Sequence, residues 1–145
     1  MKNLFLSIFM LIGFSGFAQE FDFAIGTWEG TMSKKKLTIV IEEVKKGVVK
    51  GYNILGTNKR LLKGTIKIAS GDIGGECGGE GQPYDAVLNE PGDDKWDGVF
   101  KIRFLRCPIS EPGIDSGSPE METRVNGTWK ANNGKLSGKF NLNKK

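Results

Sequence analysis

Two cysteines, Cys77 and Cys107, are the residues of this 145-residue chain with the clearest capacity for covalent chemistry. The sequence contains no histidine, so it lacks the commonest general acid–base group and the commonest transition-metal ligand. This absence excludes most hydrolase triads and the proximal ligand of most haem sites. The N-terminus, discussed below, indicates export to an oxidising compartment, and we therefore expect the two cysteines to form a disulfide.

Carboxylates gather in two long, glycine-rich segments, residues 69–83 and 107–123. Their oxygens could attract calcium, but no EF-hand spacing is present and solvated acidic loops have the same composition. Glycosidase chemistry would need two carboxylates held roughly 5 to 10 Å apart on a rigid element, which these segments do not offer. We therefore predict no metal, no cofactor and no catalytic residues. The acidic residues are Asp72, Glu76, Glu80, Glu111, Asp115, Glu120 and Glu122.

Lysine and arginine occur in and beside the short turn segments. Such cations could attract anionic glycans or lipid head groups, whereas lysines at hairpin ends also prevent edge pairing and improve solubility. No segment interleaves basic and aromatic residues, so we expect no nucleic-acid partner. The residues concerned are Lys34, Lys35, Lys36, Lys59, Arg60, Lys95, Lys130 and Lys135.

Residues 1–18 have the pattern of a secretory signal peptide. Lys2 precedes an apolar run over residues 4–14, and Gly16 and Ala18 are small where a signal peptidase reads. The run is shorter than the roughly 18 to 20 apolar residues of a membrane-spanning helix. We expect cleavage near Ala18 and a secreted or periplasmic protein that does not span the membrane. Residues 19–145 then suffice for one domain.

Apolar alternation predicts eight strands joined mostly by short turns rich in Gly, Asn, Asp and Lys. Short connections require antiparallel neighbours, and one face of each strand is apolar while the other is polar. These features predict an all-β fold, an eight-stranded antiparallel up-and-down (meander) β-barrel of lipocalin-like type, which removes both sheet edges. A two-sheet sandwich is the alternative. The expected strands are 26–32, 37–44, 48–55, 60–68, 84–90, 96–106, 124–130 and 135–142.

A pattern of apolar residue, spacer, glycine, spacer and apolar residue occurs six times, centred on Gly30, Gly51, Gly64, Gly98, Gly127 and Gly138. Residues two apart in a strand share a face, so five glycines should point inward with their apolar neighbours. The copy at Gly51 is irregular because Asn53 takes the last place. Such glycines relieve a bend or leave room for an indole or a ligand. The inward aromatic residues would either line an apolar cavity or fill it.

The two long segments should lie at one rim of the barrel. In a meander, the connections after the second, fourth and sixth strands emerge at the end where the chain enters, so Cys77 and Cys107 can meet. Their disulfide would close a loop of about 30 residues, worth roughly 3 to 4 kcal/mol in the chain-entropy model.

The stretch from Phe21 to Gly30, in which Gly26-Thr27-Trp28 opens the first strand, resembles the calycin-like barrels, among them lipocalins, fatty-acid-binding proteins, avidins and nitrobindins. The resemblance implies a barrel whose closed end is plugged by the Trp28 indole. Nitrobindins hold haem through a histidine, which this chain lacks. Avidins bind biotin through a tyrosine two residues after a glycine, whereas Tyr52 directly follows Gly51. The resemblance therefore implies a fold and neither of these functions.

Together these observations predict a non-enzymatic binding module that carries a small apolar molecule inside the barrel. The alternative is a protein- or glycan-interaction domain that uses its disulfide-tied segments, with a filled interior. Loops of this length in a compact domain are more often functional than idle. The predicted ligand-binding residues are Trp28, Trp96, Phe100, Trp129 and Phe140 inside the barrel, and Tyr84, Ile114, Asp115 and Glu120 at the loop rim.

Overall fold

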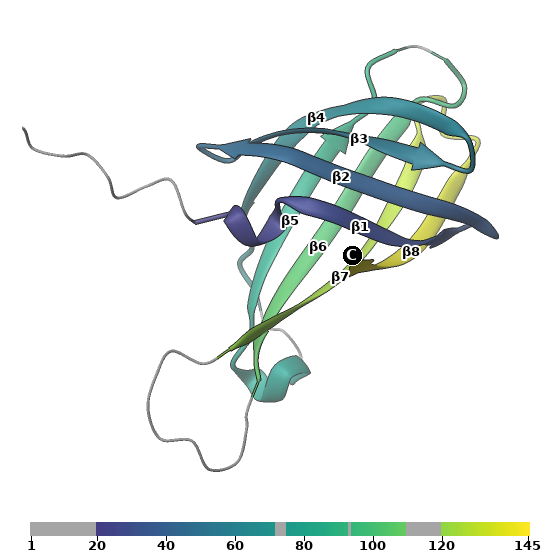
Figure 1. The fold of residues 1–145 in the computed structure, drawn as a ribbon. Helices are drawn as coiled ribbons and strands as arrows, with labels where there is room; N and C mark the ends of the chain where they lie inside the picture. The colour runs from purple at the N-terminus through teal and green to yellow at the C-terminus, as the bar shows by residue number, and fades with distance from the viewer. Residues whose placement is uncertain (1–19, 72–74, 93, 110–119) are drawn as a thin grey trace, which may run out of the picture.

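Eight antiparallel strands form one closed barrel in sequential order, and β1 pairs with β8 to complete it (Figure 1). The computed structural model describes residues 20–71, 75–92, 94–109 and 120–145. The predicted up-and-down barrel is confirmed, and it fits a calycin-like fold at this coarse level. The predicted signal peptide lies outside the described residues. The elements are η1 (Asp22–Ala24), β1 (Gly26–Met32), β2 (Lys35–Lys45), β3 (Val48–Leu55), β4 (Asn58–Ile68), η2 (Glu76–Gly79), β5 (Gln82–Asn89), β6 (Gly98–Pro108), β7 (Met121–Ala131) and β8 (Ser137–Lys144).

Several strands are longer than expected because their turns are tighter. The β1–β2 connection consists of Ser33 and Lys34, and both have positive φ, 51° and 64°. Two-residue turns of this kind match the right-handed twist of the flanking strands. The ladder therefore continues to the pair Met32 and Lys35, and β2 begins two residues before the predicted start.

All six motif glycines share the inward face of their strands. Val49 and Asn53, which flank Gly51, are buried, whereas Tyr52 points outward and lies under the Lys59 ammonium group, 3.7 Å from its ring centroid. A register shift between Ile41 and Glu43 of β2, opposite Gly51, accompanies this arrangement. The irregular copy at Gly51 thus follows the same inward pattern as the other five.

Two of these glycines allow close packing between strands. A Cβ atom on Gly98 would lie 2.5 Å from the Lys130 carbonyl oxygen and 2.6 Å from the Trp129 Nε1 atom. A Cβ on Gly127 would lie 2.5 Å from both the Lys101 carbonyl oxygen and the Phe140 ring. Glycine is therefore required at these positions for backbone approach and for aromatic rings.

Three residues expected inside the barrel are instead exposed. The exposed fractions are 47% for Trp96, 50% for Ile68 and 40% for Leu136. Trp96 and Leu136 precede β6 and β8, and Ile68 is the last residue of β4. Alternation predicts a face only where a strand is enclosed by its neighbours, so it fails at these strand ends.

The end of the barrel at which β1 begins, here called the N-terminal end, is closed by η1 and aromatic rings. The Trp28 indole Nε1 donates a hydrogen bond of 2.8 Å to the Ala24 carbonyl oxygen. Phe23 packs against Tyr84 and Phe104, with ring centroids 4.6 and 6.0 Å apart. The chain immediately before the first strand therefore plugs this end with apolar groups.

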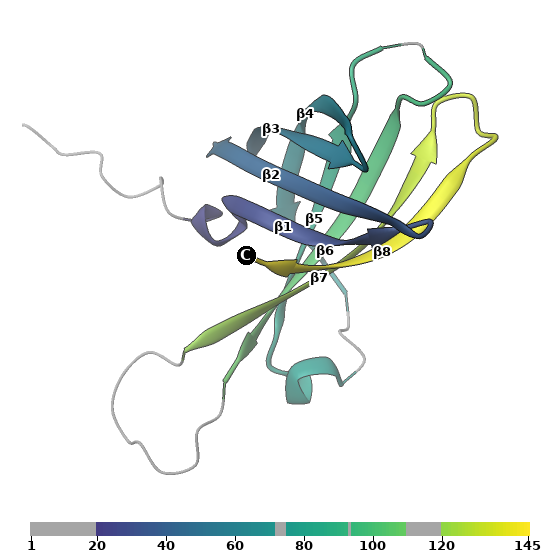
Figure 2. The ribbon, with the colours of Figure 1, turned by 45° about the vertical axis from the view of Figure 1, so that its right-hand side comes forward.

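The predicted disulfide between Cys77 and Cys107 is confirmed, with Cα atoms 5.2 Å apart. It ties η2 to β6, and Figure 2 shows this turn beside the lower ends of β5 and β6. Leu105 of β6 is buried against the same segment: a Cβ on Gly81 would meet its Cδ1 atom at 3.1 Å. Within the described ranges, no helix has the length and apolar character needed to cross a membrane.

Candidate functional site

Four of the five aromatic residues predicted to bind a ligand inside the barrel are core residues. Trp28, Phe100, Trp129 and Phe140 are buried in one apolar cluster. The Phe100 ring centroid lies 6.4 Å from that of Trp129 and 5.8 Å from that of Phe140. Trp96, the fifth, is on the surface beside the Lys95 ammonium group, 5.0 Å from its ring centroid. The rings thus pack against one another, as the filled-interior alternative expects.

A polar cluster that the sequence analysis did not identify closes the opposite end, here called the far end. Glu90 directly follows β5 and is 4% exposed. Its carboxylate accepts hydrogen bonds from the Asn53 amide at 2.8 Å and from the Trp129 indole at 3.0 Å. Arg60 of β4 forms an ion pair with Asp97, in which the Arg60 Nε atom lies 3.4 Å from the Asp97 Oδ1 atom. Glu90 lies two residues after the inward-facing Leu88, so alternation along the strand could have predicted that the Glu90 side chain also faces inward.

The residues predicted to form a loop site are not brought together among the described residues. Tyr84, predicted as an apolar anchor at the loop rim, is 8% exposed and packs against Phe21 and Phe23. It belongs to β5 and faces inward. Glu120 is exposed, and its carbonyl oxygen accepts a hydrogen bond from the Ile109 amide at 2.7 Å. Ile114 and Asp115 lie outside the described residues.

The acidic segments were also considered for calcium. Glu122 forms an ion pair with Arg124 at the start of β7. No group of three or more Cys, Asp or Glu side chains that could hold a metal ion occurs within the parts of the chain that the structure covers. Asp72, Glu111 and Asp115 fall outside them.

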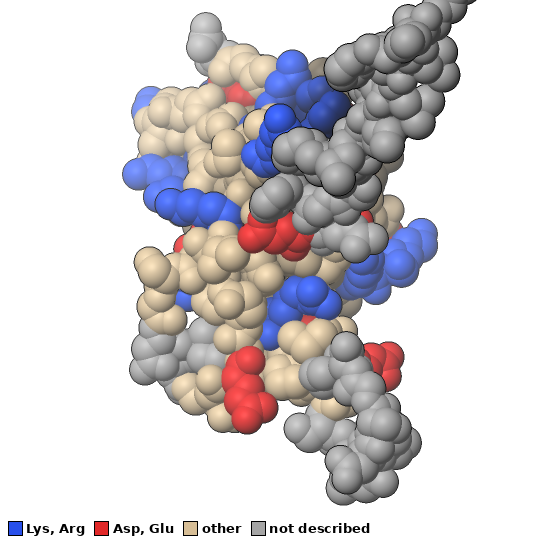
Figure 3. Space-filling model, turned by 90° about the vertical axis from the view of Figure 1, so that its left-hand side faces the viewer, with Lys and Arg blue, Asp and Glu red and all other residues tan. Residues whose placement is uncertain are grey.

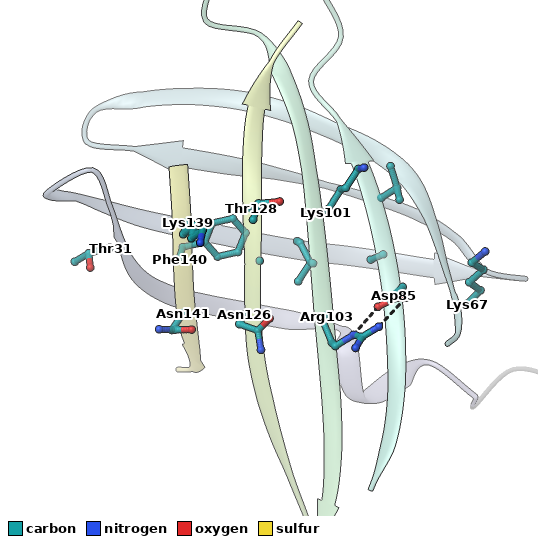
Figure 4. Close-up of a pocket in the computed structure, with 14 residues that line it drawn as sticks. Thr31, Lys67, Asp85, Lys101, Arg103, Asn126, Thr128, Lys139, Phe140 and Asn141 are labelled. Carbon is teal, nitrogen blue, oxygen red and sulfur yellow. Dashed lines mark hydrogen bonds and ion pairs between the residues drawn. The ribbon is translucent and has the colours of Figure 1, made fainter. Parts of the chain in front are cut away.

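A groove of about 870 Å³ lies on the outer wall of the barrel and crosses β4 to β8 (Figure 4). We call it the outer groove. Most of its lining side chains are polar and point away from the core, and most of them are exposed. Those that define its chemistry are Lys67, Asp85, Lys101, Arg103, Asn126 and Lys139.

Cross-strand register builds this lining. One row runs from Lys67 through Asp85, Arg103 and Asn126 to Asn141, each residue directly opposite the next on the neighbouring strand. A second row contains Lys101, Thr128 and Lys139 on β6, β7 and β8. Each row places one side chain per strand on the same face, about 5 Å from its neighbour. The residues that line the outer groove in these rows therefore belong to strands rather than to loops.

The outer groove has an excess of positive charge. It contains four cationic side chains and a single carboxylate, Asp85. Arg103 donates two hydrogen bonds to Asp85, of 2.9 and 3.2 Å, and this bonding, together with the carboxylate charge, raises the pKa of Arg103. Lys67, Lys101 and Lys139 form no ion pair with any described residue. Three cations are thus free to attract an anion.

A second groove, of about 480 Å³, continues the first toward the far end. Lys101 and Thr128 line both. Beyond them it is bordered by Val99, Lys130 and the β7–β8 turn at Asn132 and Asn133. The two hollows therefore adjoin one another along β6 and β7, and together we call them the track.

The lysines and arginines predicted to form a basic rim are partly engaged elsewhere. Lys36 pairs with Glu29 at 3.0 Å, and Arg60 pairs with Asp97. Seen from the side on which η1 lies, cationic and anionic side chains are scattered among uncharged ones (Figure 3). The groove cations stand on the polar faces of their strands, and only the register around the barrel sets them along one groove.

Comparison of the chain with protein-family models, curated proteins and solved structures gives no match. We therefore infer the function from the geometry of the outer groove.

Proposed function

We propose that this protein is a non-enzymatic, extracytoplasmic binding module that holds an anionic partner in the outer groove. The observation that carries the proposal is that Lys67, Lys101 and Lys139, without carboxylate partners among the described residues, line one hollow of about 870 Å³. A concave surface lined by one sign of charge raises the local concentration of oppositely charged ligands. The Cys77–Cys107 disulfide is compatible with a location outside the cytoplasm.

The outer wall is favoured over the interior because the core aromatic rings are buried against one another. A small apolar ligand would have to displace rings such as Phe100 and Trp129, which already pack against each other in the core. The outer groove requires no such displacement. Binding rather than catalysis is favoured because Asp85 is held by Arg103 and is the single carboxylate among the described residues that line the outer groove.

Dextran sulfate, a generic polyanion, tests this proposal. The variant Lys101→Glu/Lys139→Glu reverses two cations that flank Thr128 in the groove. The matched control, Lys50→Glu/Lys63→Glu, makes the same charge change at an exposed pair on β3 and β4. We expect titration calorimetry to show binding by the native protein and the control, and at least about tenfold weaker binding by the groove variant. Equal losses in both variants would reduce the effect to net charge and refute the proposal.

Native mass spectrometry of the protein purified from its own source separates the surface from the interior. We expect the unliganded mass of the folded chain in the absence of polyanion. A retained small apolar molecule would instead support carriage inside the barrel.

A further inference from the structure

The length of the track suits an extended chain. The outer groove and its continuation share Lys101 and Thr128 and run beside β7 to its turn with β8. Outward residues of β7 recur every second position, so the stretch from Asn126 to Asn132 spans roughly 20 Å. A small anion would occupy only a fraction of this length.

Along the track, hydrogen-bonding groups lie beside cations. Asn126, Thr128 and Lys130 are exposed, outward residues of β7. Asn141 stands opposite Asn126 on β8, and Lys139 stands opposite Thr128. Amide and hydroxyl side chains can both donate and accept, which suits the hydroxyl groups of sugars. The lysines suit carboxylates carried by the same chain.

Other extended polyanions fit less well. Single-stranded nucleic acid is held by aromatic side chains on which bases stack, and the only aromatic residue that lines either described groove is Phe140, which is buried in the core. A membrane surface would require exposed apolar side chains beside the cations, and the outer groove offers Val87 alone among exposed large ones.

We propose that the track binds a linear acidic polysaccharide, one whose sugar residues carry carboxylates, with the chain lying along β7. This inference rests on the proposed function and gives its ligand class. Lys101, Lys130 and Lys139, on β7 and the two strands beside it, attract the carboxylates, while Asn126 and Thr128 bind sugar hydroxyls. The strands hold these groups in place before binding, so little side-chain ordering beyond the lysines opposes it.

Polygalacturonate is the probe, with uncharged dextran, oligothymidine and phosphatidylglycerol vesicles as comparators. We expect the native full chain to bind polygalacturonate more tightly than any comparator, with affinity rising from the disaccharide to oligomers that span the track. Raising the salt concentration should weaken binding, because the charges are exposed. Equal or tighter binding of oligothymidine, vesicles or dextran would overturn the inference.

A second variant separates sugar recognition from simple attraction of charge. Asn126→Ala/Thr128→Val removes hydrogen-bonding groups without changing the charge, and both residues are exposed. We expect at least about fivefold weaker polygalacturonate binding and unchanged dextran sulfate binding. Thermal melting compared with the native protein establishes that the variant is folded. If dextran sulfate binding depends on Lys101 and Lys139 but this variant binds polygalacturonate normally, the ligand class is wrong and the proposed function stands.

Discussion

The two ends of this barrel are closed by opposite chemistries. At the N-terminal end, η1 and the rings of Phe23, Trp28 and Phe104 form an apolar plug, and the Trp28 hydrogen bond spans only four residues. At the far end, Glu90 is buried and held by Asn53 and Trp129, which lie 37 and 39 residues away in the chain. The first closure comes from neighbouring residues, whereas the second exists only after β3, β5 and β7 have assembled.

Because the two ends are closed differently, different kinds of substitution should destabilise them. Apolar closure depends on volume and contact, because each ring contributes through burial. Polar closure depends on complete hydrogen bonding, because a buried group without a partner costs more than its bond contributed. The following predictions use that distinction.

The largest effect is expected at the N-terminal end. Trp28→Ala should lower the free energy of unfolding by about 3 to 5 kcal/mol, because it removes a fully buried indole and leaves a cavity. Urea unfolding followed by circular dichroism measures this change. A loss under about 1 kcal/mol would mean that the plug does not support the barrel.

At the far end, Gly98→Val should destabilise the fold by about 1 to 3 kcal/mol through overpacking, because the new side chain would overlap the Trp129 indole and the neighbouring backbone. Gly134→Val, in the β7–β8 turn, serves as a contrast. A Cβ atom at position 134 would lie 3.9 Å from the nearest atom of another residue, so the destabilisation by this substitution would come from the φ of 72° alone. Thermal unfolding compares them, and unchanged stability of Gly98→Val would show that its inward placement is wrong.

A change to a single polar group should affect stability at the far end and hardly at the N-terminal end. Glu90→Gln keeps the shape but leaves the Asn53 amide or the Trp129 indole facing a donor, at a cost of about 1 to 3 kcal/mol. Tyr84→Phe, at the N-terminal end, should change stability by less than about 0.5 kcal/mol, because the ring contributes through packing. Equal effects in denaturant titrations would remove the distinction between the ends.

The smallest effect is expected on the outer wall between the ends. The hydrogen bond from Lys36, aided by Lys145, lowers the pKa of Glu29. A lowered pKa stabilises the fold above the ordinary glutamate pKa, and this contribution is lost as the pH falls through the lowered value. Lys36→Met should therefore make stability depend less steeply on pH in the acid range. An unchanged slope in pH-dependent unfolding would contradict this assignment.

Much of the fold could be predicted because it is encoded locally. Alternation over each strand and inward glycines flanked by apolar residues two positions away indicate a strongly bent sheet with one dry face. The turn residues require antiparallel neighbours, and sequential hairpins bring Cys77 and Cys107 to one rim. Strand ends could not be predicted in this way, because Trp96 precedes β6 and Ile68, the last residue of β4, is paired with β5 alone.

The sequence by itself therefore determined the strand order, the inner face and the disulfide, which follow from short-range periodicity and connection length. Only the tertiary structure decided which polar residues meet. Lys67, Asp85, Arg103 and Asn126 come from four strands and become one row because of the register around the closed barrel. A register shift of one residue would turn a whole strand face over, so no local pattern could specify the outer groove.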